Sequence, residues 1–293
     1  MTRRLPALRA APSRRRVPGA SAGRAALAAA LALIPALASA QIPDPSTAPR
    51  RALAAHEQQA YRGVGRLDMG GAYCTATLFD ASHALTAAHC LFDSQGRPRP
   101  SAEVWFRAGL RDGGEQAVRQ VRRYAVHPNY RWNGPSAAFE EIAADVAMVE
   151  LDQPLLTSSF PSYDPGDLPP PGGAVALLSY GAGRDRVLSL QEPCRVRTRS
   201  GPVASLDCEV APGSSGSPVL VRGADGTLRL AGVISARGRR LSYASAAADT
   251  LPLLRWAMDR QQIRRAAARP ETSDGLGPSP RAGGWKTSRP PQD

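Results

Sequence analysis

Short hydrophobic stretches, many of them alternating with polar residues, run through the middle of this 293-residue chain. Glycine, proline, asparagine and aspartate punctuate them, as turns punctuate β-strands. Ten stretches are expected to form strands: residues 61–67, 73–79, 84–87, 103–108, 117–125, 146–151, 174–179, 218–222, 228–235 and 241–244. Many short strands at turn-bounded spacing are typical of a sandwich or barrel, and not of alternating β and α units. The pattern therefore predicts an all-β domain.

One long helix is predicted, at the end of this domain, over residues 251–264. Leu251, Leu254 and Met258 recur at helical spacing and are suited to face the core. Thr250 is expected to cap the helix, and Pro252 falls in its first turn, where proline is tolerated.

Residues 1–40 have the pattern of an export signal. Arginines precede an apolar run, and Ala38-Ser39-Ala40 is the small-x-small sequence that signal peptidase accepts, which predicts cleavage before Gln41. The apolar run has about fourteen residues, fewer than the roughly twenty that span a bilayer as a helix. We therefore expect no stable membrane anchor and a secreted or periplasmic protein.

The remaining chain divides into three parts by composition. Residues 41–60 are rich in proline, alanine and polar side chains and are interpreted as a possible propeptide or mobile arm. Residues 61–266 are expected to form the folded domain. Residues 267–293, dominated by proline, glycine, serine and arginine, are expected to be a disordered tail.

The formal net charge of +12 raises the question of nucleic-acid binding. Residues 1–40 hold 7 arginines and no acid, and residues 264–293 hold 6 basic and 3 acidic side chains. The stretch between them has 24 basic and 22 acidic residues, so the excess charge lies in the leader and tail. No nucleic-acid partner is expected.

Three short segments carry residues suited to nucleophilic catalysis. His89 lies in Leu85-Thr86-Ala87-Ala88-His89-Cys90, Asp145 heads an apolar run, and Ser215 lies in Gly213-Ser214-Ser215-Gly216-Ser217-Pro218. A serine hydroxyl needs a base within reach, and the base needs a partner that fixes its tautomer and stabilises its charged form. The flanking glycines let the backbone turn sharply and aim amides at one point, so Gly213 and Ser215 are the expected oxyanion-hole donors.

These segments, in the order His, Asp, Ser, together with Cys74-Thr75-Ala76-Thr77-Leu78 and Gly232-Val233-Ile234-Ser235, resemble trypsin-like serine peptidases. The resemblance implies two six-stranded antiparallel β-barrels, chymotrypsin-like, with the cleft between them and a helix at the C-terminus. It also implies that His89 is the general base, Asp145 its orienting carboxylate and Ser215 the nucleophile. Ser235 resembles the strand residue that lines the cleft and pairs with the substrate backbone. The Gly-Ser-Ser-Gly-Ser-Pro version is similar to secreted bacterial members, including the glutamyl endopeptidase branch.

Departures from the animal trypsin pattern bear on activation and specificity. Ser214 stands where those enzymes carry an aspartate that receives the freed N-terminal ammonium, so that ion pair cannot form. By the resemblance, Glu209, six residues before Ser215, lies at the base of the specificity pocket, and a buried carboxylate there favours a basic side chain before the scissile bond. Arg237, close after Ser235, opposes this effect. The glutamyl branch has a histidine where this chain has Ile234. We therefore favour a preference for a basic side chain before the scissile bond.

The four cysteines of an exported chain allow three disulfide pairings. We favour Cys74 with Cys90 and Cys194 with Cys208. The first would tie the strand ahead of the histidine to the base of its loop, and the second would clamp the segment leading to Gly213. A zinc site is the alternative, but the cysteines lack close paired spacing and the sequence has no His-Glu-x-x-His.

The sequence thus predicts a secreted, monomeric serine endopeptidase that acts on protein or peptide substrates without a metal or cofactor. The competing hypothesis is a catalytically silent trypsin-like binding protein; such relatives typically lose a triad member, whereas this chain keeps all three. An α/β-hydrolase esterase would need a Gly-x-Ser-x-Gly elbow and the order Ser, Asp, His, and the chain has neither.

Overall fold

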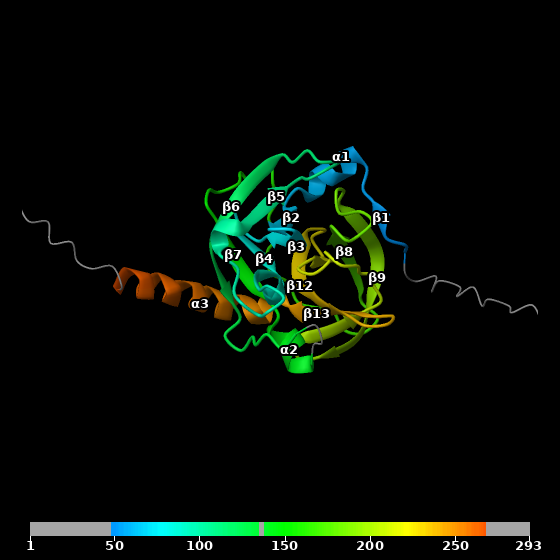
Figure 1. Ribbon diagram of the computed structural model, residues 1–293. Helices are drawn as coiled ribbons and strands as arrows, with labels where there is room; N and C mark the ends of the chain where they lie inside the picture. The colour runs from blue at the N-terminus through cyan, green and yellow to red at the C-terminus, as the bar shows by residue number, and fades with distance from the viewer. Residues whose placement is uncertain (1–47, 135–137, 268–293) are drawn as a thin grey trace, which may run out of the picture. The chain divides into compact units, whose positions relative to one another are not determined.

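Two closed β-barrels make up most of the computed structural model, which describes residues 48–134 and 138–267 (Figure 1). The described residues all belong to one unit, residues 42–293. The export signal and the part of the tail from residue 268 onward lie outside the described residues. Among the described residues, no helix combines the length and apolar character that crossing a membrane requires.

The first barrel is closed by six antiparallel strands in the order β2-β3-β4-β7-β6-β5. Its strands are β2 (Val64–Met69), β3 (Ala72–Leu78), β4 (His83–Thr86), β5 (Val104–Ala108), β6 (Ala117–Val126) and β7 (Ala147–Leu151). Apolar side chains at alternating positions, such as Leu67, Phe106 and Val149, point inward and form its core.

The second barrel has the order β9-β10-β13-β12-β11-β8 and closes through the pairing of β8 with β9. Its strands are β8 (Ala174–Ser179), β9 (Ser189–Ser200), β10 (Val203–Leu206), β11 (Pro218–Arg222), β12 (Leu228–Arg237) and β13 (Ser242–Ala246). Leu177, Val196 and Leu206 lie in its core. The structure confirms the predicted all-β fold with two six-stranded barrels.

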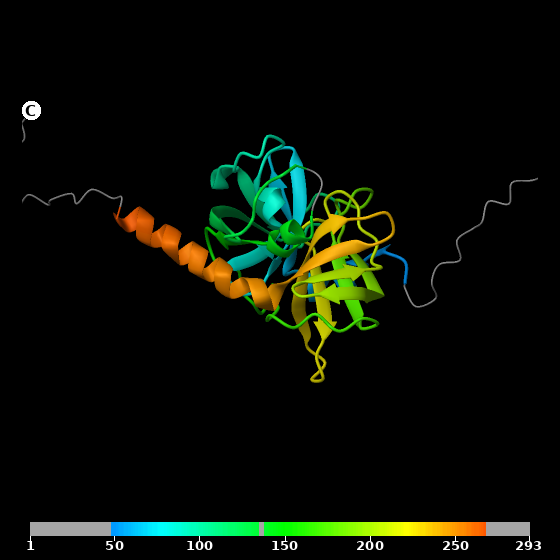
Figure 2. The same cartoon turned by 90° about the horizontal axis from the view of Figure 1, so that it is seen from below.

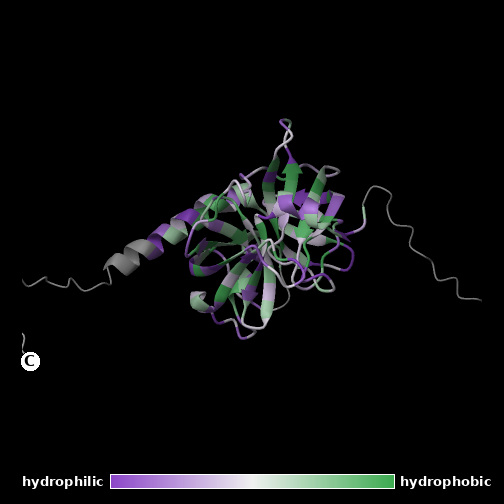
Figure 3. Cartoon of the chain, turned by 90° about the horizontal axis from the view of Figure 1, so that it is seen from above, coloured by the Kyte–Doolittle hydropathy of each residue, from purple (hydrophilic) through white to green (hydrophobic). Residues whose placement is uncertain are grey.

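A third hydrophobic cluster joins the barrels. It combines Leu85 and Met148 of the first barrel with Leu178 and Val233 of the second. The strands alternate in colour between hydrophobic and hydrophilic positions, as expected where one face of each strand is buried (Figure 3).

The predicted C-terminal helix is confirmed as α3 (Ala247–Ala267), which continues directly from β13 and packs against β6 and β7 (Figure 2). Leu251, Leu254 and Met258 are buried, as expected. The cap expected at Thr250 is wrong, because the helix begins three residues earlier. The Thr250 hydroxyl instead donates to the carbonyl oxygen of Ala246, 2.9 Å away.

Three short helices lie in loops of the first barrel. They are η2 (Ala88–Leu91), η3 (Ser101–Glu103) and α2 (Phe139–Ala144). In α2 the side chain of Glu141 accepts a hydrogen bond from the backbone N–H of Ala138, 2.8 Å away, which satisfies one donor at the helix start.

The segment ahead of the first barrel, interpreted from the sequence as a possible propeptide or mobile arm, contains short regular elements where the structure describes it. It forms β1 (Arg51–Ala52), α1 (Ala55–Gln58) and η1 (Gln59–Tyr61), and β1 pairs with β9. Leu53 is buried in the cluster between the barrels, and the Gln58 side chain donates to the carbonyl oxygen of Leu110 at 2.9 Å. Burial of one leucine and this pairing account for the order of residues 48–60; removal of the segment as a propeptide stays a prediction.

Both predicted disulfides are present. The Cα atoms of Cys74 and Cys90 are 6.3 Å apart, and those of Cys194 and Cys208 are 5.3 Å apart. The first joins β3 to η2, and the second joins β9 to the loop after β10.

Candidate active site

His89 and Asp145 form a hydrogen-bonded pair at the edge of the first barrel. His89 lies in η2, directly after β4, and the Cys74–Cys90 disulfide fixes the next residue. Asp145 ends α2 just before β7 and is 5% exposed. One carboxylate oxygen lies 2.7 Å from His89 Nδ1, and the other accepts the His89 backbone N–H at 2.8 Å. Asp145 therefore fixes both the ring and the backbone of His89.

The environment of His89 favours its charged form. Burial alone lowers the pKa of this imidazole, but the negative charge of Asp145 and the hydrogen bond to it outweigh burial, so the pKa is raised above 6.5. Asp145 occupies Nδ1, which leaves Nε2 as the nitrogen that can exchange a proton with another group.

Ser235 provides a further hydrogen bond to the aspartate. It lies on β12, it is 6% exposed, and its hydroxyl donates to Asp145 Oδ2 at 2.6 Å. The resemblance indicated a cleft-lining residue, which the structure supports, but it did not indicate this contact with Asp145.

Ser215 lies in a tight loop between β10 and β11 that is attached to both barrels. Its carbonyl oxygen accepts the backbone N–H of Thr75 on β3 at 2.8 Å, and Gly216 N–H donates to Ile234 on β12 at 2.7 Å. Gly216 has φ +80°, and a Cβ there would lie 2.1 Å from the Thr75 carbonyl oxygen. Only glycine fits this close approach.

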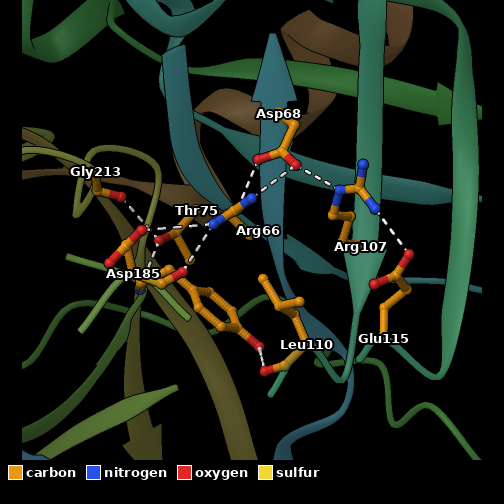
Figure 4. Close-up of polar contacts among 9 residues, drawn as sticks. Arg66, Asp68, Thr75, Arg107, Leu110, Glu115, Asp185 and Gly213 are labelled. Carbon is orange, nitrogen blue, oxygen red and sulfur yellow. Dashed lines mark hydrogen bonds and ion pairs between the residues drawn. The ribbon is translucent and has the colours of Figure 1, made fainter. Parts of the chain in front are cut away.

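The Thr75 side chain strengthens the same attachment. Its hydroxyl donates to the carbonyl oxygen of Gly213 at 3.0 Å and accepts the backbone N–H of Tyr180 at 3.0 Å (Figure 4). Thr75 belongs to one of the segments that resemble trypsin-like peptidases, but the resemblance assigned it no role. No local signal identifies this contact, because Thr75 and Gly213 are 138 residues apart.

An ion-pair network lies next to this threonine. Asp68 accepts hydrogen bonds from the guanidinium groups of Arg66 and Arg107, and Arg107 also contacts Glu115 at 2.8 Å (Figure 4). Arg66 further donates to the carbonyl oxygen of Asp185, in the loop after β8, at 3.0 Å. The network therefore links the first barrel to a loop of the second.

Two backbone amides of the loop that carries Ser215 have no hydrogen-bond partner among the described residues. The N–H groups of Ser214 and Ser217 bond within the loop, to Ala211 and to Ser214. In the described part of the chain, the N–H groups of Gly213 and Ser215 donate to no protein acceptor. Backbone N–H groups that are free to donate at one point can form an oxyanion hole.

The three predicted catalytic residues line one cavity of about 1150 Å³, together with Ser235. Tyr130, Trp132 and Phe139 supply an apolar wall. The structure thus brings together side chains that are far apart in sequence, and the cavity is large enough for several residues of an extended peptide.

The interpretation of Glu209 as a buried specificity carboxylate is not supported by its position. Its side chain is 63% exposed, does not line this cavity, and has its Oε1 3.8 Å from Nε of Arg50. Arg50 comes from the N-terminal segment, which sequence reasoning had left outside the domain. Arg237 lines the cavity.

Cys74, His89 and Cys90 lie close enough together to suggest a metal site, with ligand atoms within 4.8 Å of one another. Both sulfurs are in a disulfide, however, and His89 Nδ1 is bonded to Asp145. This donor set offers no thiolate, which a zinc site of this type needs.

Comparison with known proteins agrees with this geometry. A family model described as a trypsin-like peptidase domain matches residues 74–228, more than half of the chain. The chain is similar to "Serine protease 23" of Homo sapiens, with 27% identity over 166 residues that cover 51% of this chain and 43% of that protein. It is also similar to the "Cercarial protease" of Schistosoma mansoni, with 30% identity over 178 residues that cover 50% of this chain and 65% of that protein. The matched regions thus span 43% and 65% of the length of these two relatives.

Among solved structures, the fold is similar to that of a Glu endopeptidase in complex with MPD. The TM-score is 0.60 with 16% identity, and the match covers 72% of this chain and 96% of that one. At this identity the match supports the shared architecture alone.

Proposed function

Because the chain belongs to the trypsin-like peptidase family, we propose that it is a serine endopeptidase whose catalytic residues are His89, Asp145 and Ser215. One observation carries the proposal. Ser215 lines the same cavity as a histidine that is held by a buried aspartate, and the backbone amides of Gly213 and Ser215 have no hydrogen-bond partner among the described residues. A nucleophile, a base and oxyanion donors are the parts that acyl transfer requires.

In the proposed mechanism, the Ser215 hydroxyl attacks the carbonyl carbon of the scissile bond while His89 Nε2 accepts its proton. Asp145 stabilises the resulting imidazolium through the 2.7 Å contact. The Gly213 and Ser215 amides bind the negative oxygen of the tetrahedral intermediate. His89 then protonates the leaving amine, and an acyl-enzyme forms at Ser215. Water, deprotonated by His89, attacks this ester and releases the second product, which restores the hydroxyl.

We also propose that the protein acts outside the cytoplasm, in the periplasm or the medium. The leader over residues 1–40 and the two disulfides support this location, because disulfides persist in oxidising compartments.

Fluorophosphonate labelling tests the proposed activity. Folded protein with intact disulfides is expected to be labelled, and S215A is expected to lose the label. S158A serves as the matched control, because Ser158 is exposed on a loop and is expected to leave labelling unchanged. Absence of label on folded wild type would contradict the proposal and favour the silent binding protein; labelled S215A would place the nucleophile elsewhere.

A further inference from the structure

Arg50 is a buried cation in the N-terminal segment. It is 8% exposed, and its Nε and Nη1 atoms have no hydrogen-bond partner among the described residues. Nη2 makes one long hydrogen bond, 3.4 Å, to the carbonyl oxygen of Ala182. Burying a charge with so few partners costs free energy, so the position of this side chain calls for an explanation.

The backbone around Arg50 is held firmly against the second barrel. The Ala48 N–H donates to the carbonyl oxygen of Pro193 at 2.9 Å, and the Arg50 carbonyl oxygen accepts from Arg184 at 2.8 Å. The next residues pair with β9 as strand β1. The burial of the guanidinium is therefore fixed by main-chain bonds on both sides of it.

The guanidinium contacts the segment that leads to the nucleophile. Nε lies 3.8 Å from Glu209 Oε1. Nη1 of Arg50 and the hydroxyl of Ser214 both lie against Gly181. A Cβ atom added to this glycine would lie 2.4 Å from Arg50 Nη1 and 2.6 Å from Ser214 Oγ. Neighbouring Ala182, which accepts the hydrogen bond from Nη2, donates its own N–H to Pro212 at 2.7 Å.

The charge balance around Arg50 is uneven. Burial lowers the pKa of Arg50, Glu209 opposes that effect, and Arg184 adds to it. An arginine remains protonated at neutral pH despite such a shift. Because Glu209 is largely exposed, it neutralises the cation only in part, and the carbonyl oxygen of Ala182 is the one further acceptor that the guanidinium has among the described residues.

We propose that Arg50 is a positioning residue that holds residues 209–214 in the conformation that leaves the Gly213 and Ser215 amides free for an oxyanion. The catalytic part of this inference rests on the proposed function. The chain has Ser214 where animal trypsins have an aspartate, and Arg50 supplies a cation beside that serine from within the folded chain. No newly cleaved amino terminus is needed to provide it.

Substitution of Arg50 tests this role with two measurements. R50M keeps most of the side-chain volume and removes the charge and the donors, and R50K retains a charge. R51M is the matched control, because the neighbouring Arg51 is 53% exposed and pairs with Glu57 on the surface. Each variant is measured for its rate of fluorophosphonate labelling and for hydrogen exchange of the amides in residues 209–216, with a thermal melt as the check on folding.

R50M is expected to label roughly 10- to 100-fold more slowly than wild type, as for a small misplacement of catalytic groups. Exchange is expected to rise in residues 209–216, whereas R51M matches wild type and R50K recovers part of the labelling rate. Equal labelling and unchanged exchange in R50M would overturn the inference, as would faster exchange confined to β1 and α1. If R50M does not fold, the labelling rate and the amide exchange of R50K are compared with those of wild type, and equal values would overturn the inference. If wild type is not labelled, the proposed function fails, and the exchange measurement alone decides whether Arg50 positions the segment.

Discussion

Replacing Asp145 by asparagine gives the sharpest test of the charge behind His89. D145N keeps the shape of the side chain and removes its negative charge. The aspartate makes a 2.7 Å contact with His89 Nδ1 and also accepts the His89 backbone N–H at 2.8 Å. Losing one charge-assisted hydrogen bond, worth about 1.5–3 kcal/mol, slows reaction by roughly 10- to 150-fold.

A second effect increases this loss. An asparagine NH₂ placed toward Nδ1 forces the proton onto Nε2, so the nitrogen facing the cavity can no longer accept one. Together these effects predict a fall in the labelling rate of about 10² to 10⁴.

The pH profile of D145N provides an independent readout. In wild type the pKa of His89 is raised by Asp145 against the effect of burial, so the rate is expected to rise with pH around a midpoint above 6.5. Without the carboxylate, burial dominates, and the midpoint is expected to shift to lower pH. The assay is the fluorophosphonate labelling rate from pH 5 to pH 9, with D225N, on the exposed β11–β12 hairpin, as the control. A D145N midpoint at or above that of wild type, or a rate loss below tenfold, would refute the reasoning.

Three further predictions concern the supports of the site. S235A removes the 2.6 Å hydrogen bond to the aspartate, so labelling is expected to slow about tenfold with the fold retained; a rate within twofold of wild type would count against this. G216A is expected to lower the free energy of unfolding by more than about 3 kcal/mol in urea titrations, because its Cβ would clash with the Thr75 carbonyl oxygen. The control G183A, at φ +81° with no atom within 4 Å of the added Cβ, is expected to lower it by about 1 kcal/mol. Equal losses in the two variants would contradict the packing argument. Replacing Cys194 and Cys208 by serine opens a loop of 14 residues and is expected to cost about 3 kcal/mol in thermal melts, and an unchanged melting temperature would show that the bond adds nothing.

The predictions that succeeded depend on local sequence. The serine motif was recognisable in part because Gly216 has φ +80°, a backbone conformation that favours glycine and leaves a local mark in the sequence. Strands β9 and β10 were missed. β9 carries Pro193 and arginines at positions that face outward, so its hydrophobic alternation is weak.

The features that sequence could not supply depend on distant contacts. Glu209 lies near Arg50, which is 159 residues earlier in the chain, and its side chain is largely exposed. The hydroxyl of Ser235 donates to Asp145, 90 residues earlier in the chain, and the sequence around neither residue indicates this contact. Side-chain direction in loops is set by tertiary packing, which no periodicity reports.

The attachment of the serine loop to Thr75 has a consequence for the molecule as a whole. Ser215, the proposed nucleophile, belongs to a loop of the second barrel, yet its main chain is anchored on β3 of the first. A hinge motion that opened the barrels would therefore pull the reacting groups out of alignment. If the two halves were produced as separate polypeptides, activity should return only when they reassociate into one body.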